Sequence, residues 1–306
     1  MVVFATQQSR FKTVQNISLS RMKDAWEKAK AGLQFAVNFL RTNAGIEDES
    51  LLTSPMIIMA IAAFGAVRNC ELTAQEEKSL LKWILTANAR GRFSRGSTET
   101  ILDQDLNLIF KRAPLDDLFG LMKGQFGRLH VEPQDFVGRG ARSTLFSTSY
   151  LALKGLGAKD WRSGLGLSLT HQGKMHYIEY HHIFPKSLLA KERYEKAEIN
   201  EIANIAFISG RLNRGILNKE PRKYFPEILA KQGEAALAKH LIPTEPHLWE
   251  LNRYREFLDW RRKRLAGAVN NLLETEIPLS VQCSRSLFRW RGRAISVLLA
   301  GWNRQR

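Results

Sequence analysis

A short segment near the middle of the chain interrupts a sequence that is otherwise patterned for helices. Residues 163–182 read SGLGLSLTHQGKMHYIEYHH, a stretch punctuated by glycines, with aromatic and β-branched residues towards its end. This composition favours short strands over a helix. We therefore expect two short strands with a turn near Gln172–Gly173, inserted into a helical protein.

Apolar residues recur at helical spacing through much of the rest of the chain. Helices are predicted over residues 22–40, after the start signals at Ser54 and Thr73, after Gly96, around residues 145–156 and over residues 249–273. The GRGARS run at residues 138–143 marks a loop between two of them. The pattern predicts a mainly α protein that carries a small α+β insert.

The same patterns divide the chain into three parts. We expect a helical domain at residues 1–163, a small central module at residues 164–235, and a C-terminal helical region at residues 236–306. The last part ends in a tail, residues 277–306, with six Arg, no Lys and no acidic residue. The tail is expected to dock on the body or to be partly disordered, with contact to nucleic acid or a membrane as alternatives.

The charge balance points to a polyanionic partner. Among 306 residues, 46 Lys and Arg oppose 30 Asp and Glu, which gives a net charge of +16. Such a field attracts DNA, RNA or an anionic membrane. The apolar run at residues 55–67 is too short to cross a bilayer, so a membrane role is not expected. The two cysteines, Cys70 and Cys283, exclude a disulfide framework and a cysteine-based zinc site, and suit the cytoplasm.

Two adjacent histidines, His181 and His182, begin a series of polar residues that suits phosphodiester hydrolysis. Asn204 and Asn213 follow downstream, with Asn218 as an alternative to Asn213. The basic residues nearby are candidates for binding phosphate: Lys186, Arg211, Arg214, Lys219 and Arg222. The reaction needs a base for water, a cation for the phosphate charge and groups that bind the polyanion, and this set can supply all three.

Roles can be assigned to these residues as hypotheses. His182 would be the base, and His181 and Asn213 would bind a divalent metal ion. One imidazole and one amide oxygen leave most positions to water and phosphate, which suits Mg²⁺ or Mn²⁺ better than Ni²⁺ or Zn²⁺. Glu179 would either orient a site residue by hydrogen bonding or be an exposed strand residue. Because neighbours on a strand point to opposite faces, both histidines can serve one site only where the strand ends or bulges.

The motif EYHHIFPKSLL, followed by NEIANIAFISGRLNRGILNKEP, resembles the HNH nucleases, whose module is a ββα-metal finger. The closest likeness is to the helical and HNH portion of GmrSD-type modification-dependent restriction proteins, over roughly residues 20–275. The resemblance implies that His182 is the general base and that His181 and Asn213 bind metal. It also implies that Asn204 pins the loop that orients the base.

The resemblance further implies a DNA endonuclease that acts in defence against foreign DNA, with no small-molecule substrate. The N-terminal ParB-like domain of the longer family members has no counterpart in this sequence, so a separate ParB-like or NTPase regulatory subunit is a candidate partner. Two alternatives stay open. The chain could be a non-catalytic DNA-binding or docking subunit, or an RNase or toxin with the same finger.

Overall fold

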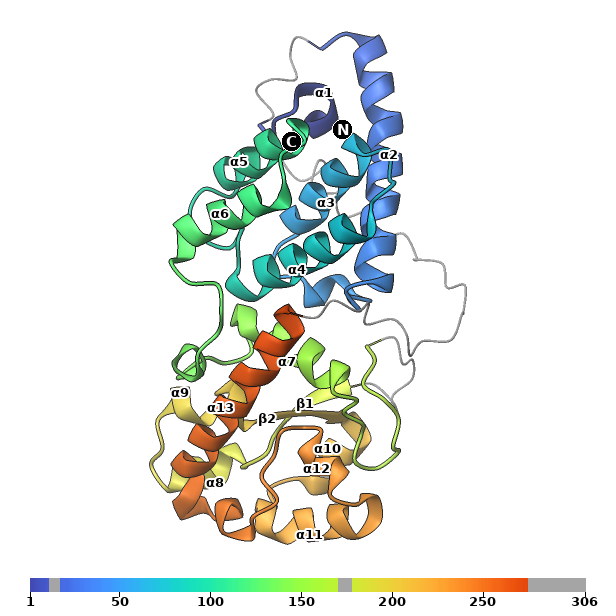
Figure 1. Cartoon of the computed structure of the whole chain (residues 1–306). Coiled ribbons are helices and arrows are strands. Elements are labelled where there is room, and N and C mark those ends of the chain that lie inside the picture. Colours follow the sequence, from blue (N-terminus) through green and yellow to red (C-terminus); the bar gives the residue numbers. More distant parts are fainter. Residues whose placement is uncertain (11–16, 170–177, 275–306) are drawn as a thin grey trace, which may run out of the picture.

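A computed structural model of the chain describes residues 1–10, 17–169 and 178–274, and it shows a mainly helical protein with a small antiparallel sheet (Figure 1). The predicted hairpin turn near Gln172–Gly173 and the tail at residues 277–306 lie outside the described residues. The predicted combination of a mainly α fold with a small β insert is confirmed. None of the helices in the described ranges combines the length and the apolar character that a bilayer span requires.

Six helices form the upper half of the molecule in Figure 1: α1 (Val2–Thr6), α2 (Leu19–Thr42), α3 (Met56–Val67), α4 (Ala74–Arg90), α5 (Thr98–Phe110) and α6 (Leu115–Phe126). The apolar helix α3 packs against α2 and α5, and it is buried along most of its length because it has almost no polar residue to present to water. The predicted cap at Thr73 starts α4 in a capping box with Glu76.

The lower half holds the sheet and the remaining helices. The segment before the sheet contains the short 3₁₀ helix η3 (Pro133–Phe136) and α7 (Thr144–Gly155). The elements that surround the sheet are α8 (Lys186–Lys191), α9 (Lys196–Ile199), η4 (Ile202–Asn204), α10 (Gly210–Ile216), α11 (Pro221–Gln232), α12 (Ala235–Ala238) and α13 (Tyr254–Leu273). The predicted long C-terminal helix starts later than its apolar spacing indicated, because η5 (Pro246–Trp249) and η6 (Leu251–Arg253) precede it.

Two strands make up the sheet. Strand β1 (Ile178–His182) pairs antiparallel with β2 (Ile205–Ser209), so that His181 lies opposite Ala206 and His182 opposite Ile205. The partner of β1 is therefore a strand that follows it along the chain. In the described residues 163–169, which were expected to pair with β1, there is an isolated bridge from Gly166 to Lys159 instead. Helix α10 begins directly after β2, whereas α8, α9 and η4 lie between the two strands.

Helix α7 joins the sheet to the rest of the protein. The rings of Phe146 and Tyr150 on α7 pack on Phe207 of β2, and Phe146 also meets Tyr180 of β1 edge to face. The sequence assigned α7 to the first of the three predicted domains, and the structure shows it packed on the strands of the second. The predicted boundaries between the three parts stay a prediction.

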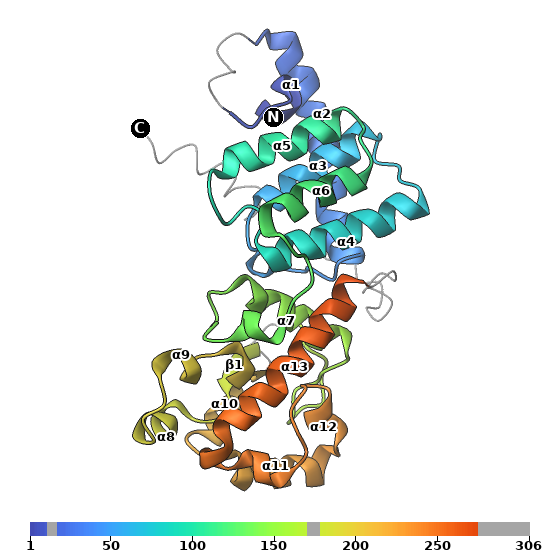
Figure 2. The same ribbon diagram turned by 60° about the vertical axis from the view of Figure 1, so that its left-hand side comes forward.

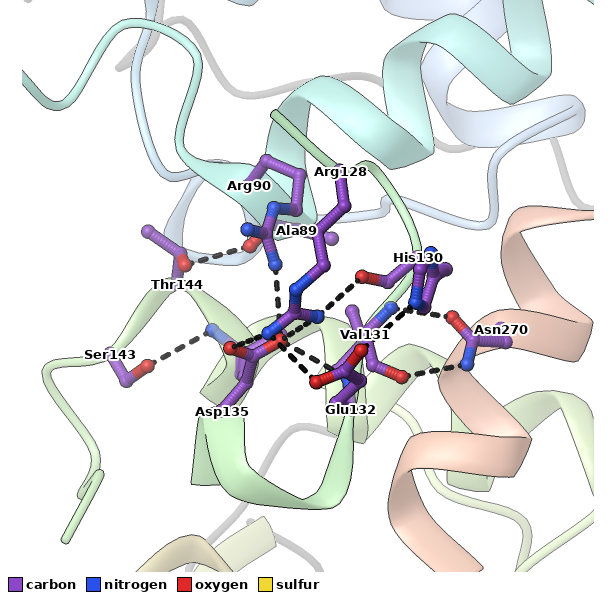
Figure 3. A network of polar contacts seen from close by, with 11 residues as sticks. Ala89, Arg90, Arg128, His130, Val131, Glu132, Asp135, Ser143, Thr144 and Asn270 are labelled. Atoms are coloured by element: carbon purple, nitrogen blue, oxygen red, sulfur yellow. Dashed lines mark hydrogen bonds and ion pairs between the residues drawn. The ribbon is translucent and has the colours of Figure 1, made fainter. Parts of the chain in front are cut away.

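Polar contacts tie the two halves together beside α7 (Figure 3). The carboxylate of Asp135 on η3 accepts hydrogen bonds from Arg90 on α4 and from Arg128. The side chain of Asn270 on α13 bonds both backbone groups of Val131, at 2.8 Å each. These bonds fix the segment that leads into the sheet region relative to α4 and α13.

Candidate active site

The two histidines lie on opposite sides of β1. Along the strand, Ile178 and His181 are buried, Glu179 and His182 are half-buried and Tyr180 is exposed. Because side chains alternate along a strand, Glu179 and His181 share one side, and Tyr180 and His182 share the other. We call these the His181 side and the His182 side. The strand ends at His182, but both histidines are still in register with β2.

On the His181 side, three side chains form a chain of hydrogen bonds. Nδ1 of His181 lies 2.8 Å from Oδ1 of Asn213 on α10, and Nδ2 of Asn213 donates to Oε2 of Glu179 at 2.8 Å. Since the Asn213 amide donates to Glu179, its oxygen faces His181 and accepts the proton on Nδ1. The other oxygen of Glu179 meets the guanidinium of Arg214 at 3.4 Å. The structure thus brings Glu179, His181 and Asn213 together.

The second nitrogen of His181 faces Tyr224 of α11. The hydroxyl of Tyr224 donates to the carbonyl of Ile183 at 2.8 Å and lies 3.4 Å from Nε2 of His181. Burial raises the pKa of Tyr224, so the hydroxyl keeps its proton. With that proton donated to Ile183, the hydroxyl oxygen can accept from Nε2. His181 therefore has an acceptor on each side of its ring, one for each neutral tautomer.

Burial also decides the charge of His181. The side chain is 3% exposed, and desolvation lowers its pKa to about 4, although the bond to Asn213 opposes the shift. The ring of Trp161 packs edge-on against it. Near pH 7 His181 is thus a neutral imidazole, which is the form that binds metal ions.

On the His182 side, the imidazole has an unsatisfied nitrogen. Nε2 of His182 is shielded from solvent and has no hydrogen-bond partner among the described residues. Burial lowers the pKa of His182 to about 4, with further lowering from Lys186 and His181, while the Asn200 side chain has the opposite effect. Tyr180, 50% exposed, packs its ring beside the imidazole. A buried polar nitrogen without a partner is costly, and such groups occur at functional sites.

Asn204 fixes the loop that connects the two strands. Its side chain is fully buried and accepts from the backbone N–H of Phe184 at 2.9 Å. Its amide nitrogen donates to the carbonyls of Phe184 and Ile199, at 3.1 and 3.0 Å. The backbone carbonyl of Asn204 also accepts from Ile183. One residue therefore joins both ends of the loop and sets the direction in which the chain leaves His182.

The donors on the His181 side fit a divalent cation. Bonds from magnesium to its ligands are about 2.1 Å long, so adjacent ligands of an octahedral ion lie about 3 Å apart. The 2.8 Å between Nδ1 of His181 and Oδ1 of Asn213 suits such a pair once Nδ1 has lost its proton, and Tyr224 can then accept from Nε2. Within the described ranges no group of three or more His, Cys, Asp or Glu could hold an ion, so other positions would fall to oxygens of water or phosphate.

The predicted phosphate-binding residues fall on both sides of the strand. Arg214 is paired with Glu179, and Arg222 lies 2.8 Å from Glu220. Lys186 starts α8 on the His182 side, while Arg211 and Lys219 are exposed at and beyond the two ends of α10. Asn218, the alternative ligand, is also exposed and lies beyond the end of α10. The structure places Asn213, and not Asn218, against His181.

No protein-family model matches the chain, and no curated protein matches it.

Three residues of this region were missed by sequence reasoning: Tyr180, Asn200 and Tyr224. Strand alternation alone could have placed Tyr180 beside His182, since the two are separated by one residue. Asn200 and Tyr224 carry no such signal. Asn200 follows α9 and Tyr224 lies in α11, so both are far from the histidines along the chain. They reach the histidines only because these helices fold back over the strands, and no local pattern encodes that packing.

Proposed function

We propose that the chain is a metal-dependent endonuclease of the HNH type that hydrolyses DNA phosphodiester bonds. The observation that carries the proposal is the pair of possible metal ligands, Nδ1 of His181 on β1 and Oδ1 of Asn213 on α10, the helix that directly follows β2, which lie 2.8 Å apart. The net charge of +16 supports a polyanionic substrate.

His181 and Asn213 would bind the cation, and Glu179 would orient the Asn213 amide through its hydrogen bond. When bound, the cation would supply Lewis-acid stabilisation of charge on the phosphate. Tyr224 positions the His181 ring by contacting Nε2, opposite to the metal-binding nitrogen. Glu179 and Tyr224 would therefore orient the two metal ligands through hydrogen bonds at fixed atoms.

Because β1 ends at His182, a phosphate bound at this end of the strand would be within reach of both histidines. His182 would accept a proton from the attacking water at its free nitrogen. Its imidazole is neutral near pH 7 because its pKa is lowered to about 4, and a neutral imidazole can act as a base. A phosphate bound beside the ring would raise this pKa, because a nearby negative charge favours the protonated form. In the proposed reaction the P–O bond to the 3′ oxygen breaks, which leaves 5′-phosphate and 3′-hydroxyl ends.

The proposal is tested by incubating the purified chain with plasmid DNA and Mg²⁺ or Mn²⁺, with and without a chelator. We expect nicking or cutting that needs the metal and that is lost in His181→Ala and Asn213→Ala. His247→Ala is the matched control, because His247 is exposed and outside the site. Cutting that continues in chelator, or that survives both substitutions, would contradict the proposal.

A second candidate function is a DNA-binding or docking subunit without catalysis. It is favoured by the opposite placement of the two imidazoles, and by the fact that Glu179, His181 and Asn213 already satisfy one another. This function predicts salt-sensitive DNA binding with no metal-dependent cutting. Repeating the assay with single-stranded RNA separates both candidates from an RNase.

A further inference from the structure

A loop outside the motif carries two arginines next to the His182 side. Residues 138–143, with the sequence GRGARS, lead from η3 into α7, and we call them the arginine loop. Arg139 and Arg142 are exposed, and within the described part of the chain neither guanidinium makes a hydrogen bond or an ion pair. Two unpaired cations on one short loop make a concentrated positive charge.

The start of the loop is fixed against the segment that precedes β2. The backbone N–H of Gly138 donates to Oε2 of Glu201 at 3.0 Å, and the carbonyl of Arg139 accepts from Ile202 at 2.7 Å. Glu201 is itself held by two bonds from Arg262 of α13, at 2.6 and 2.7 Å. The charge of Glu201, which bonds the loop backbone, is thus already opposed by Arg262.

The backbone conformation and packing of the loop require glycine at both positions. Gly138 has a φ of 67°, a region that favours glycine. A Cβ atom on Gly140 would lie 2.8 Å from the carbonyl oxygen of Asn200, which is too close for any other residue. The close approach therefore presses the loop directly against Asn200.

The far ends of the loop are anchored as well (Figure 3). At one end, Asp135 is bound by Arg90 and Arg128. At the other end, Ser143 caps α7 and the Thr144 hydroxyl donates to the carbonyl of Ala89 at 2.8 Å. A loop fixed at its ends and middle has little backbone entropy left to lose on binding.

The arginine loop borders the His182 side through two contacts. It packs on Asn200, whose side chain lies beside His182. It also runs into α7, where Phe146 meets Tyr180, the neighbour of His182. In Figure 2 the green segment before α7 lies next to α9 and β1.

The two sides of β1 differ in how their positive charges are matched. On the His181 side, Arg214 is paired with Glu179, and Arg222 and Lys223 with Glu220. On the His182 side the described residues provide no ion pair for Lys186, Arg139 or Arg142. Three cations without an ion pair among the described residues therefore lie on the side that carries the unsatisfied imidazole nitrogen, and a polyanion would be attracted there.

We propose that the arginine loop is a DNA-backbone-binding element, in which Arg139 and Arg142 bind phosphates that flank the one presented to His182. The inference deepens the proposed function and rests on it for the identity of the polyanion. Arginine suits this role because its planar group donates two parallel hydrogen bonds to a phosphate.

The test compares DNA binding by the full chain and by a double variant, Arg139→Gln with Arg142→Gln. Binding of a labelled duplex is followed by fluorescence anisotropy in chelator, over a range of salt concentrations. We expect affinity to fall about tenfold near 0.1 M salt, and the slope of log K against log salt to decrease by about 2, as expected for two lost phosphate contacts.

The matched control is Lys23→Gln with Lys28→Gln, which removes the same charge from exposed positions on α2, far from the sheet. The control should change affinity less than about twofold, since its charges lie more than a Debye length from the site. A second double variant, Arg139→Lys with Arg142→Lys, keeps the charge and should retain most of the binding. If the Gln pair lowers the melting temperature, the Lys pair still tests whether the positive charge of the loop is needed for DNA binding.

The outcomes distinguish failure of the arginine-loop proposal from failure of the nuclease proposal. Equal binding by the Gln pair and the α2 control overturns the role of the arginine loop, whether or not the chain cuts DNA. Loss of binding in the Gln pair, with no metal-dependent cutting by the natural chain, supports the loop and overturns the nuclease. No binding of DNA by the natural chain overturns both.

Discussion

Each side of β1 carries one of two adjacent histidines, but the hydrogen bonding of the two imidazoles differs. On the His181 side every polar group has a partner, because Asn213 lies between His181 and Glu179, and Tyr224 closes the far end. On the His182 side a shielded nitrogen has no partner among the described residues. One side is therefore complete without a ligand, and the other is not.

This difference suggests different tasks. A ring held between two acceptors has a fixed orientation, which suits a metal ligand. A ring with an unsatisfied nitrogen gains by meeting a proton donor, which suits a base. The His182 side also carries Lys186, Arg139 and Arg142, none of which forms an ion pair with another described residue.

The largest effect is expected for His182→Ala. If His182 is the base and His181 a metal ligand, the rate of cutting falls about 10³-fold, as on removal of a general base. DNA binding in chelator stays unchanged. The measurement is a single-turnover cleavage rate beside a binding isotherm. Equal loss of binding and cutting would mean that His182 serves the DNA-binding surface and not the chemistry.

His240 provides a reference for a buried histidine outside the proposed site. Burial lowers its pKa to about 4, whereas the unfolded chain titrates near 6.5. The unfolded state therefore binds more protons between these values, so the folded state loses stability as pH falls through this window. His240→Gln should reduce the loss of unfolding free energy between pH 7 and 4.5 by about 2 kcal/mol, measured by urea denaturation.

The same variant tests whether a lowered pKa by itself marks function in this protein. His240→Gln should retain metal-dependent cutting at pH 7 wherever the chain remains folded. Loss of cutting with unchanged stability would show that His240 is a third functional histidine beside His181 and His182.

Tyr224→Phe is expected to have an intermediate effect. It removes the hydroxyl that contacts Nε2 of His181 and bonds Ile183, so the ring loses the acceptor that its metal-binding tautomer needs. Loss of such a supporting bond weakens metal binding about tenfold. Titration calorimetry with Mn²⁺ measures this directly, and rescue of cutting at high Mn²⁺ distinguishes a positioning role from general damage.

The smallest effect is expected for Arg214→Gln. Its side chain is 62% exposed and its charge is already opposed by Glu179, an arrangement that contributes little in water. DNA affinity should change less than about twofold, in contrast to the arginine loop variants. A tenfold loss would place the DNA on the His181 side and reverse the proposed comparison.

Much of the fold could be predicted because it is encoded locally. Apolar spacing gave α2, α4 and α7 to within a few residues, and the Thr73 cap placed the start of α4. The apolar run after Asn204 forms β2. Helical periodicity, capping and strand alternation depend on neighbours a few residues apart, so a sequence can carry them without knowledge of the fold.

Of the candidate site, the sequence by itself supplied the residue types and their order: two histidines, then Asn204 and Asn213. Only the tertiary structure decided that β1 pairs with β2, that the two histidines diverge, that Tyr224 reaches His181, and that the arginine loop borders His182. These contacts join residues far apart in the chain, and their geometry depends on how whole helices pack. Local patterns contain no information on that packing, which arises from burying the apolar faces of all the elements together.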